Sequence, residues 1–292
     1  MTALIFGINS QDGFYLKKKL QLLNIEIVGV SRSKGEWLEG SVTNKDFVDS
    51  LIKSLRPQYI FHIAAVSTTI HDVLLENHEI ISTGSLNILE SVLRNSPESK
   101  VFLTGSGLQF VNTGVPIDEM TCFDPNSAYS ISRIHSVYTA RYFRTLGIRV
   151  YVGYLFHHES YLRKDHHVSK KISEAVARIS NGSNEKLLIG DPSVQKEWTF
   201  AGDVINGIMC LVSQETIYEA CIGSGVTYSI LDWIKACFSV VNLDWEEFLN
   251  KKEGFNPEYR TLLSNPNLIK SFGWNPTTSI NDLAFKMVSK QV

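Results

Sequence analysis

The sequence has few of the features that mark secreted, membrane-spanning or nucleic-acid-binding proteins. Only four of its 292 residues are cysteine, and their wide spacing matches neither a zinc motif nor a dense disulfide framework. No hydrophobic run approaches the roughly 20 residues that span a bilayer, and the amino end lacks the basic and apolar segments of a signal peptide. We therefore expect a cytoplasmic protein with free thiols and no membrane contact.

An excess of charge of either sign is also missing. The 28 lysine and arginine residues nearly balance the 30 aspartate and glutamate residues, which gives a formal net charge of -2. Such a balance provides no broad attraction to nucleic acid or anionic lipid. With 43% hydrophobic and 20% charged residues, the composition is that of a globular protein. A small molecule is the expected partner.

What is present is a regular alternation of strand-like and helix-like segments. Short β-branched runs predict strands at residues 4–6, 25–30, 59–65, 101–103 and 150–155. Apolar residues at helical spacing predict helices at residues 14–23, 44–55, 82–93 and 127–146, the last of which Gly147 ends. This order is typical of βαβ units. We predict an α/β fold with a Rossmann-type doubly wound parallel sheet.

The pattern becomes less regular from about residue 156. Helices are predicted at 168–180, 230–241 and 280–288, with a further helix capped by Asp203, and strands at 187–189, 198–200 and 220–223. These elements indicate a smaller, mixed α/β lobe. We divide the chain into a cofactor-binding domain at 1–155 and a substrate lobe at 156–292, with strands that can interleave. The cleft between them is the expected substrate site.

A glycine turn follows the first strand. Gly7 and Gly13 fit the first and last glycines of a Gly-x-x-Gly-x-x-Gly pattern, with Ser10 at the middle position. A strand that runs through such a turn into a helix presents backbone N–H groups to a pyrophosphate. The pattern alone equally fits a tight turn without a ligand.

The residues after the second strand bear on the choice of cofactor. Arg32 and Ser33 stand where an acidic residue would bind the ribose hydroxyls of NAD, and residues 31–34 contain no acid. An arginine with a hydroxyl suits the 2′-phosphate of NADP, so NADP(H) is favoured over NAD(H). Ala64 and Ala65 end a buried strand in small side chains, as a bound cofactor would require, although core packing explains them equally well.

A tyrosine and an arginine stand one helical turn apart, at Tyr129 and Arg133. A phenol and a cation on one helix face are the groups that proton transfer beside a nicotinamide requires. An exposed helix pair without function would have the same spacing.

Taken together, these segments resemble the extended short-chain dehydrogenase/reductases, and most closely the GDP-mannose 4,6-dehydratases and related nucleotide-sugar epimerases and reductases. The similarity extends over nearly the whole chain. It is carried by residues 3–13, 61–65, 127–133, 155–160, 170–179, 196–198 with Asp203, 259–266 and 272–276. The resemblance implies that NADP binds to the first lobe and a nucleotide-diphosphate sugar, for example a GDP-sugar, binds in the cleft. It also implies hydride transfer at C4 of the sugar.

The resemblance also assigns roles to residues. Tyr129 exchanges the proton of the C4 hydroxyl, and Arg133 replaces the lysine that holds the nicotinamide ribose, with Thr104 or Ser106 supplying a hydroxyl. The implied cofactor contacts are Gly7, Asn9, Ser10, Gln11, Asp12, Gly13, Arg32, Ser33, Ala64, Ala65, Tyr129, Arg133 and Leu155. The implied substrate contacts are His157, Glu159, Lys171, Lys196 and Glu258. No metal is expected, because the adjacent histidines at 157–158 and 166–167 project in different directions.

Several positions depart from the family pattern. They are Ser10, Ser41, Ile81, Gly105, Gly107, Arg133, His157 and Phe255. Gly105 replaces the serine or threonine that hydrogen-bonds the reacting oxygen, and Gly107 replaces the glutamate that removes the C5 proton. An arginine keeps the positive charge of the lysine but cannot take part in a proton relay.

Three functions remain open. Keto reduction or epimerisation at C4 needs no C5 base and is favoured. Dehydration would need another base, such as Glu119 or His157. A third possibility is a catalytically impaired family member that acts as a cofactor-binding, sugar-nucleotide-binding or scaffold protein. The resemblance further implies a homodimer formed through the helix at 127–146.

Overall fold

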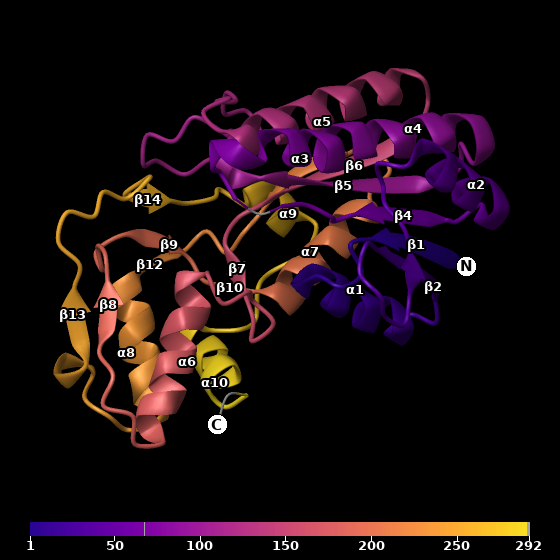
Figure 1. The fold of residues 1–292 in the computed structure, drawn as a ribbon. Coiled ribbons are helices and arrows are strands. Elements are labelled where there is room, and N and C mark those ends of the chain that lie inside the picture. The colour runs from indigo at the N-terminus through magenta and orange to yellow at the C-terminus, as the bar shows by residue number, and fades with distance from the viewer. Residues whose placement is uncertain (67, 291–292) are drawn as a thin grey trace.

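The computed structural model describes residues 1–66 and 68–290, and its main feature is a seven-stranded sheet (Figure 1). The strand order is β11-β6-β5-β4-β1-β2-β3, and every pairing is parallel. The strands are β1 (Thr2–Phe6), β2 (Glu26–Ser31), β3 (Leu38–Glu39), β4 (Tyr59–His62), β5 (Lys100–Ser106), β6 (Arg149–Leu155) and β11 (Glu219–Ile222). The predicted α/β class with a doubly wound parallel sheet is confirmed.

Helices cover both faces of this sheet, which explains why its central strands are almost entirely apolar. One face packs against α2 (Lys45–Leu55), α4 (Gly84–Asn95) and α5 (Ala128–Thr145), and the other against α1 (Gln11–Leu22) and α7 (Ala201–Val212) (Figure 1). Short helical segments complete this part: η1 (His71–Val73), α3 (Leu74–Asn77), the π-helical turn η2 (His78–Thr83), η3 (Gly107–Gln109) and α9 (Asn267–Ser271).

The smaller lobe packs three helices around a separate core. These are α6 (Val168–Ser180), α8 (Ile230–Val240) and α10 (Ile280–Val288), with Trp233 and Met287 fully buried among them. Around them lie β7 (His158–Glu159), β8 (Leu187–Ile189), β9 (Gln195–Glu197), β10 (Thr199–Phe200), β12 (Thr227–Ser229), β13 (Leu249–Lys251), β14 (Thr261–Leu262) and η4 (Trp245–Glu247). The lobe is mixed α/β, as predicted.

Two of the predictions differ from the structure. The strand predicted at 220–223 in the smaller lobe is β11, which pairs with β6 as an edge strand of the main sheet. The division of the chain at residue 155 stays a prediction, but the sheet takes one strand from beyond it. The prediction that Asp203 caps a helix is wrong, because α7 begins at Ala201 and the Asp203 carboxylate instead accepts hydrogen bonds from the N–H groups of Thr277 and Thr278.

None of the described helices is long and apolar enough to cross a bilayer. The four cysteines are unpaired, and two of them, Cys221 and Cys237, are buried.

Candidate functional site

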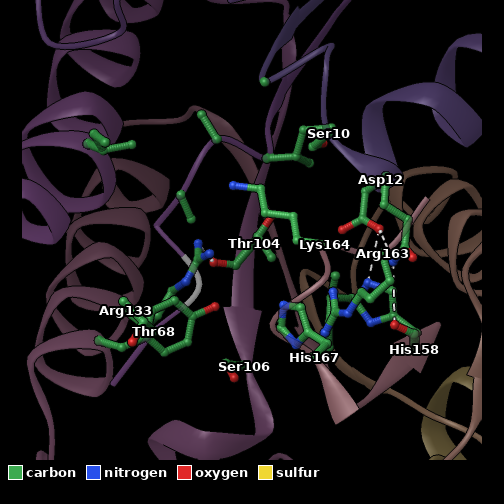
Figure 2. Close-up of a pocket in the computed structure, with 18 of the residues that line it drawn as sticks. Ser10, Asp12, Thr68, Thr104, Ser106, Arg133, His158, Arg163, Lys164 and His167 are labelled. Atoms are coloured by element: carbon green, nitrogen blue, oxygen red, sulfur yellow. Dashed lines mark hydrogen bonds and ion pairs between the residues drawn. The ribbon is translucent and has the colours of Figure 1, made fainter. Parts of the chain in front are cut away.

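A cavity of about 740 Å³ lies at the carboxyl edge of the sheet. The ends of β1, β2, β4, β5 and β6 form its floor, and residues 157–168, Lys196 and Glu258 bring the smaller lobe to its other side. In doubly wound folds ligands bind at this edge, and the volume is in the range of small-molecule sites. Figure 2 shows Arg133 on one side of this cavity and Asp12, His158 and Arg163 on the other.

The glycine turn is held in shape by close backbone contacts. Gly7 has φ of +96°, and a Cβ there would lie 2.7 Å from the backbone N of Ala64. A Cβ on Gly13 would lie 2.4 Å from the carbonyl oxygen of Ile8. Both positions therefore require glycine. Ser10, the middle residue, is the N-cap of α1, and its Oγ accepts a hydrogen bond from the N–H of Gly13 at 3.0 Å.

This turn places its polar residues on the cavity. Asn9, Ser10, Gln11 and Asp12 line it, whereas Gly13 is buried behind them. The start of α1 thus offers N–H groups and a positive helix end to an anion. The close contact of Gly7 with Ala64 also explains why β4 ends at His62 and not at residue 65 as predicted, since the chain turns over the glycine there.

The end of the cavity next to β2 carries one arginine and several hydroxyls. Arg32 and Ser33 line it, and Asn9 donates a hydrogen bond from Nδ2 to Ser33 Oγ at 3.1 Å. Arg32 Nη1 lies 3.0 Å from Glu76 Oε1, with both side chains largely exposed. An exposed pair of this kind is weak, so Arg32 can exchange Glu76 for another anion at small cost.

Tyr129 and Arg133 lie together on the cavity wall. The guanidinium carbon of Arg133 is 4.9 Å from the centroid of the Tyr129 ring, and Nη1 donates a hydrogen bond to the Thr104 carbonyl at 2.5 Å. Arg133 is only 3% exposed. Its Nε is buried without a partner in the described chain, whereas Nη2 is neither buried nor bonded there and is open to the cavity. No hydrogen bond to a described residue engages the Tyr129 phenol.

A neutral histidine lies beneath this pair. His62 is buried, and one ring nitrogen is 3.0 Å from the Ile80 carbonyl. Burial, together with the charge of Arg133, lowers the pKa of His62 to about 4. Of His62 and Arg133, only Arg133 therefore contributes a positive charge to this region.

The two candidate hydroxyls differ in availability. Thr104 Oγ1 donates a hydrogen bond to the His62 carbonyl at 3.1 Å, so its proton is already used. Ser106 Oγ accepts a hydrogen bond from the Leu108 N–H at 3.2 Å, and no described residue accepts its proton. Both residues line the cavity, but only Ser106 has a hydroxyl proton to offer a ligand.

The two glycines that depart from the family pattern are packed against aromatic rings. A Cβ on Gly105 would lie 2.6 Å from Cδ1 of Tyr154, and a Cβ on Gly107 would lie 2.8 Å from Cε1 of Phe156. Both rings are buried, so they cannot move aside freely. The structure therefore has no room for the missing hydroxyl or carboxylate at these positions.

The predicted substrate residues separate into two groups. His157, Lys196 and Glu258 line the cavity. Glu159 is only 1% exposed and lies behind the wall, and Lys171 is exposed on α6 outside the cavity. Direct ligand contact by these last two residues does not fit the structure.

Glu159 is instead surrounded by cations. Its carboxylate lies 3.1 Å from Arg163 Nε and 3.7 Å from Lys196 Nζ, and accepts a hydrogen bond from Ser169 Oγ at 2.6 Å. Burial would raise the pKa of Glu159, but the charges of Arg163 and Lys196 outweigh it and lower that pKa to about 2. The carboxylate is therefore ionised and holds both cations.

Neither alternative base is suited to take the C5 proton. Glu119 does not line the cavity, and its Oε1 accepts a hydrogen bond from the Cys221 N–H at 2.6 Å. His157 does line the cavity, but burial and the charge of Lys196 lower its pKa well below the usual value. Its Nε2 is 2.9 Å from the Tyr259 hydroxyl, so that nitrogen is already engaged.

The cavity is also lined by residues that the predicted site did not include, among them His158, Arg163, Lys164 and His167. The ring of His158 lies 3.0 Å from Asp12 through Nε2 and 2.7 Å from the Phe156 carbonyl through Nδ1, which requires both nitrogens to donate. Burial would raise the pKa of Asp12, but the His158 charge outweighs it and lowers that pKa to about 2. This ion pair ties α1 to β7.

Within residues 1–66 and 68–290, no three histidine, cysteine, aspartate or glutamate side chains come together as a metal site would require.

Comparison with known proteins gives one consistent family. The sequence model of the GDP-mannose 4,6 dehydratase family matches residues 4–287. The chain belongs to this family. GDP-mannose 4,6 dehydratase 1 of Arabidopsis thaliana is 26% identical over 322 residues, covering 99% of this chain and 89% of that protein. The Dictyostelium discoideum GDP-mannose 4,6 dehydratase is 24% identical over 339 residues, covering 99% and 95%.

Solved structures share the fold at lower identity. RMD from Pseudomonas aeruginosa complexed with NADPH superposes with a TM-score of 0.87 at 18% identity, over 99% of this chain and 98% of that one. UDP-glucose 4-epimerase from Thermotoga maritima with UDP-glucose gives a TM-score of 0.86 at 18% identity, over the same shares. The predicted resemblance to extended short-chain dehydrogenase/reductases is confirmed.

Proposed function

We propose that this protein transfers a hydride between NADP(H) and C4 of a nucleotide-diphosphate sugar, by keto reduction or epimerisation and not by dehydration. The observation that carries the proposal is that one cavity contains both the glycine turn of α1 and the Tyr129–Arg133 pair. A dinucleotide anchored at the turn and a sugar held by the smaller lobe would meet beside Tyr129.

The cavity fits the cofactor in two respects. The glycine turn places the start of α1 on the cavity, where its N–H groups would meet a pyrophosphate, and Nη2 of Arg133 is open toward the place of a ribose. A bound nicotinamide would supply or accept the hydride. Arg32 and Ser33 would meet a 2′-phosphate, which favours NADP(H), and their lining position is compatible with that role.

Tyr129 would exchange a proton with the C4 oxygen. Its phenol is unbonded within the described chain, lies on the cavity and has the Arg133 guanidinium beside its ring. Ser106 would donate a hydrogen bond to the same oxygen. Arg133 would orient the ribose but would not pass protons.

Dehydration is disfavoured for a packing reason. The Phe156 ring fills the space next to Gly107, Glu119 lies outside the cavity, and the depressed pKa of His157 makes it a weak base. Reduction and epimerisation do not need this base.

A second candidate is a family member that binds the cofactor or the sugar nucleotide without turnover. The observation that favours it is the Tyr154 ring against Gly105, which leaves only Ser106 to supply a hydroxyl. Such a protein would keep the glycine turn and the cation-lined wall.

One experiment separates these candidates. Saturating NADPH at 100 times its dissociation constant should stabilise the fold by about 2.7 kcal/mol if the protein is an enzyme or binds the cofactor without turnover. Addition of a 4-keto nucleotide sugar should then consume NADPH only if the protein is an enzyme. Absence of both effects would remove the proposed function and leave only a protein that binds the sugar nucleotide.

A homodimer through α5 is part of the proposal. Ile131, Tyr138 and Tyr142 are 45%, 58% and 60% exposed and lie at i, i+7 and i+11, which places them on one face of α5. Replacement Tyr138→Glu should shift the sedimentation coefficient from that of a dimer to that of a monomer. A monomeric parent protein would contradict the dimer.

A further inference from the structure

The first turn of α1 is tied by side chains to the end of β7 and the residue after it. The amide of Gln11 uses both of its ends there: Oε1 accepts a hydrogen bond from Ser160 Oγ at 2.7 Å, and Nε2 donates one to the His158 carbonyl at 3.4 Å. The next residue, Asp12, forms the ion pair with His158 at 3.0 Å (Figure 2). The start of the helix is therefore fixed relative to residues 158–160.

Ser160 also fixes the chain that comes after it. Its Oγ accepts a hydrogen bond from the Leu162 N–H at 3.2 Å, and its carbonyl accepts one from the Arg163 N–H at 3.0 Å. Ser160 is only 1% exposed and does not line the cavity, so it is not placed to contact a ligand. One buried hydroxyl thus connects Gln11 with the backbone of the segment at 161–167, which leads into α6.

The segment at 161–167 is a partly exposed turn beside the cavity. Residues 164–166 are exposed, and Arg163 is held by its contact with Glu159. Turns with few buried contacts are the parts of a protein that open most readily, so a ligand that binds beside this one bears a cost for ordering it. The residues of the segment that line the cavity are Leu162, Arg163, Lys164, His166 and His167.

We infer that Ser160 is a positioning residue that couples the two sides of the cavity, so that a dinucleotide at the glycine turn and a nucleotide sugar beside residues 161–167 strengthen each other's binding. A pyrophosphate at the start of α1 would fix the first turn of the helix and, through Gln11 and Ser160, the segment at 161–167. The second ligand would then meet a segment that is already ordered. By linkage, the effect is equal for either order of binding. This inference rests on the proposed function.

The ion pair of Asp12 with His158 does not provide the same connection. His158 Nδ1 donates a hydrogen bond to the Phe156 carbonyl at 2.7 Å, which precedes it in the chain, and not to residues 161–167. Asp12 and His158 also line the cavity, so their replacement would change ligand contact and coupling together. Ser160 is the residue at which the coupling can be removed while the ligand contacts stay.

Calorimetric titration of the full chain with GDP and with UDP, each in the absence and presence of saturating NADPH, measures the coupling. In the parent protein, NADPH should tighten the nucleotide that binds by about 5- to 150-fold, the usual range of coupling between two sites. Ser160→Ala should bring this ratio close to 1, because alanine cannot connect Gln11 with Leu162. A merely structural role of Ser160 would lower Tm or weaken both ligands and leave the ratio unchanged.

Ser173→Ala is the matched control. Ser173 is a fully buried serine of α6, and its hydroxyl donates a hydrogen bond to the Lys170 carbonyl at 3.1 Å, so this bond stays within the helix. The control should keep the ratio of the parent protein. Gln11→Ala breaks the bond to Ser160 from the other side and carries the test if Ser160→Ala does not fold. The double variant should lose no more coupling than either single variant, because both remove one hydrogen bond.

The failures of the inference and of the proposed function are distinguishable. A parent-like ratio in both Ser160→Ala and Gln11→Ala would overturn the inference and leave the proposed function intact, as would a parent protein that binds NADPH and a nucleotide independently. Loss of the coupling in Ser173→Ala as well would overturn the specific role of Ser160. A parent protein that binds neither NADPH nor a nucleotide would overturn both.

Discussion

The most informative perturbation is Gly105→Ser, which returns the missing hydroxyl to its family position. The new Cβ would lie 2.6 Å from Cδ1 of Tyr154, closer than packed carbon atoms approach one another. Tyr154 is fully buried, and its hydroxyl donates a hydrogen bond to Glu219 Oε2 at 2.5 Å, so the ring is fixed at both ends. Overpacking of this kind costs about 1–3 kcal/mol.

The assay is thermal unfolding of the parent and variant proteins. A loss of 1 kcal/mol lowers Tm by about 2–4 °C in domains of 150–250 residues, so Gly105→Ser should lower Tm by several degrees. Tyr154→Leu should also destabilise the fold, because it leaves a void and removes the bond to Glu219. The double variant should lose less than the sum of the two, since the clash is absent from it. A Gly105→Ser protein as stable as the parent would refute the argument that Tyr154 fills this site.

Three further predictions concern charged side chains. Asp12 raises the pKa of His158 against the effect of burial, so the ion pair stabilises the fold fully below the ordinary histidine pKa and less as pH rises through the raised value. The difference in Tm between the parent and His158→Asn should therefore shrink from pH 6 to pH 9. A constant difference would contradict the ion pair. Arg32→Met should weaken NADPH about tenfold or more and leave NADH nearly unchanged, as measured by calorimetry, whereas equal losses would remove the 2′-phosphate assignment. Arg133→Lys should lower stability by about 1–3 kcal/mol and lower turnover, because lysine cannot both reach the Thr104 carbonyl and face the ribose; higher turnover would show that the site still suits lysine.

The ends of several elements could be predicted from the sequence. The helices at 168–180 and 280–288 and the strand at 187–189 are confirmed at both ends. Their boundaries are set locally, by Ser279 as an N-cap or by a turn that follows. The strand predicted at 59–65 ends earlier because a tertiary contact with Gly7, which no local pattern reveals, turns the chain.

The pairing of strands and the burial of side chains could not be predicted from the sequence. The run at 220–223 has the composition of a strand, but composition does not say that it pairs with β6, some 65 residues earlier in the chain (Glu219↔Val152). Glu159 and Lys171 are both polar, yet one is buried behind the cavity and the other is on the surface. Glu159 in β7 is enclosed by Arg163, Lys196 and Ser169, which come from other segments of the chain, so sequence periodicity could not reveal its burial.

The cavity illustrates the same limit. The departures at Gly105 and Gly107 were visible in the sequence as missing side chains, but the rings of Tyr154 and Phe156 that occupy the space belong to another strand and the residue after it. Arg163 and Lys164 belong to a basic stretch of the sequence. They precede α6, so helical phasing could not place them, and Arg163 is held at the cavity by its contact with Glu159.

The proposed reaction depends most on Tyr129, the group that exchanges the proton of the C4 oxygen. The direct measurement is the consumption of NADPH, followed by its fluorescence, by the parent and by Tyr129→Phe in the presence of a 4-keto nucleotide sugar, with NADPH affinity determined for both. We predict that the parent consumes NADPH and that the variant binds it equally well but turns over at least 100-fold more slowly, the low end of a general acid's contribution of about 10²–10⁴. Equal rates in the two proteins, or bound NADPH that the parent never consumes, would contradict the account.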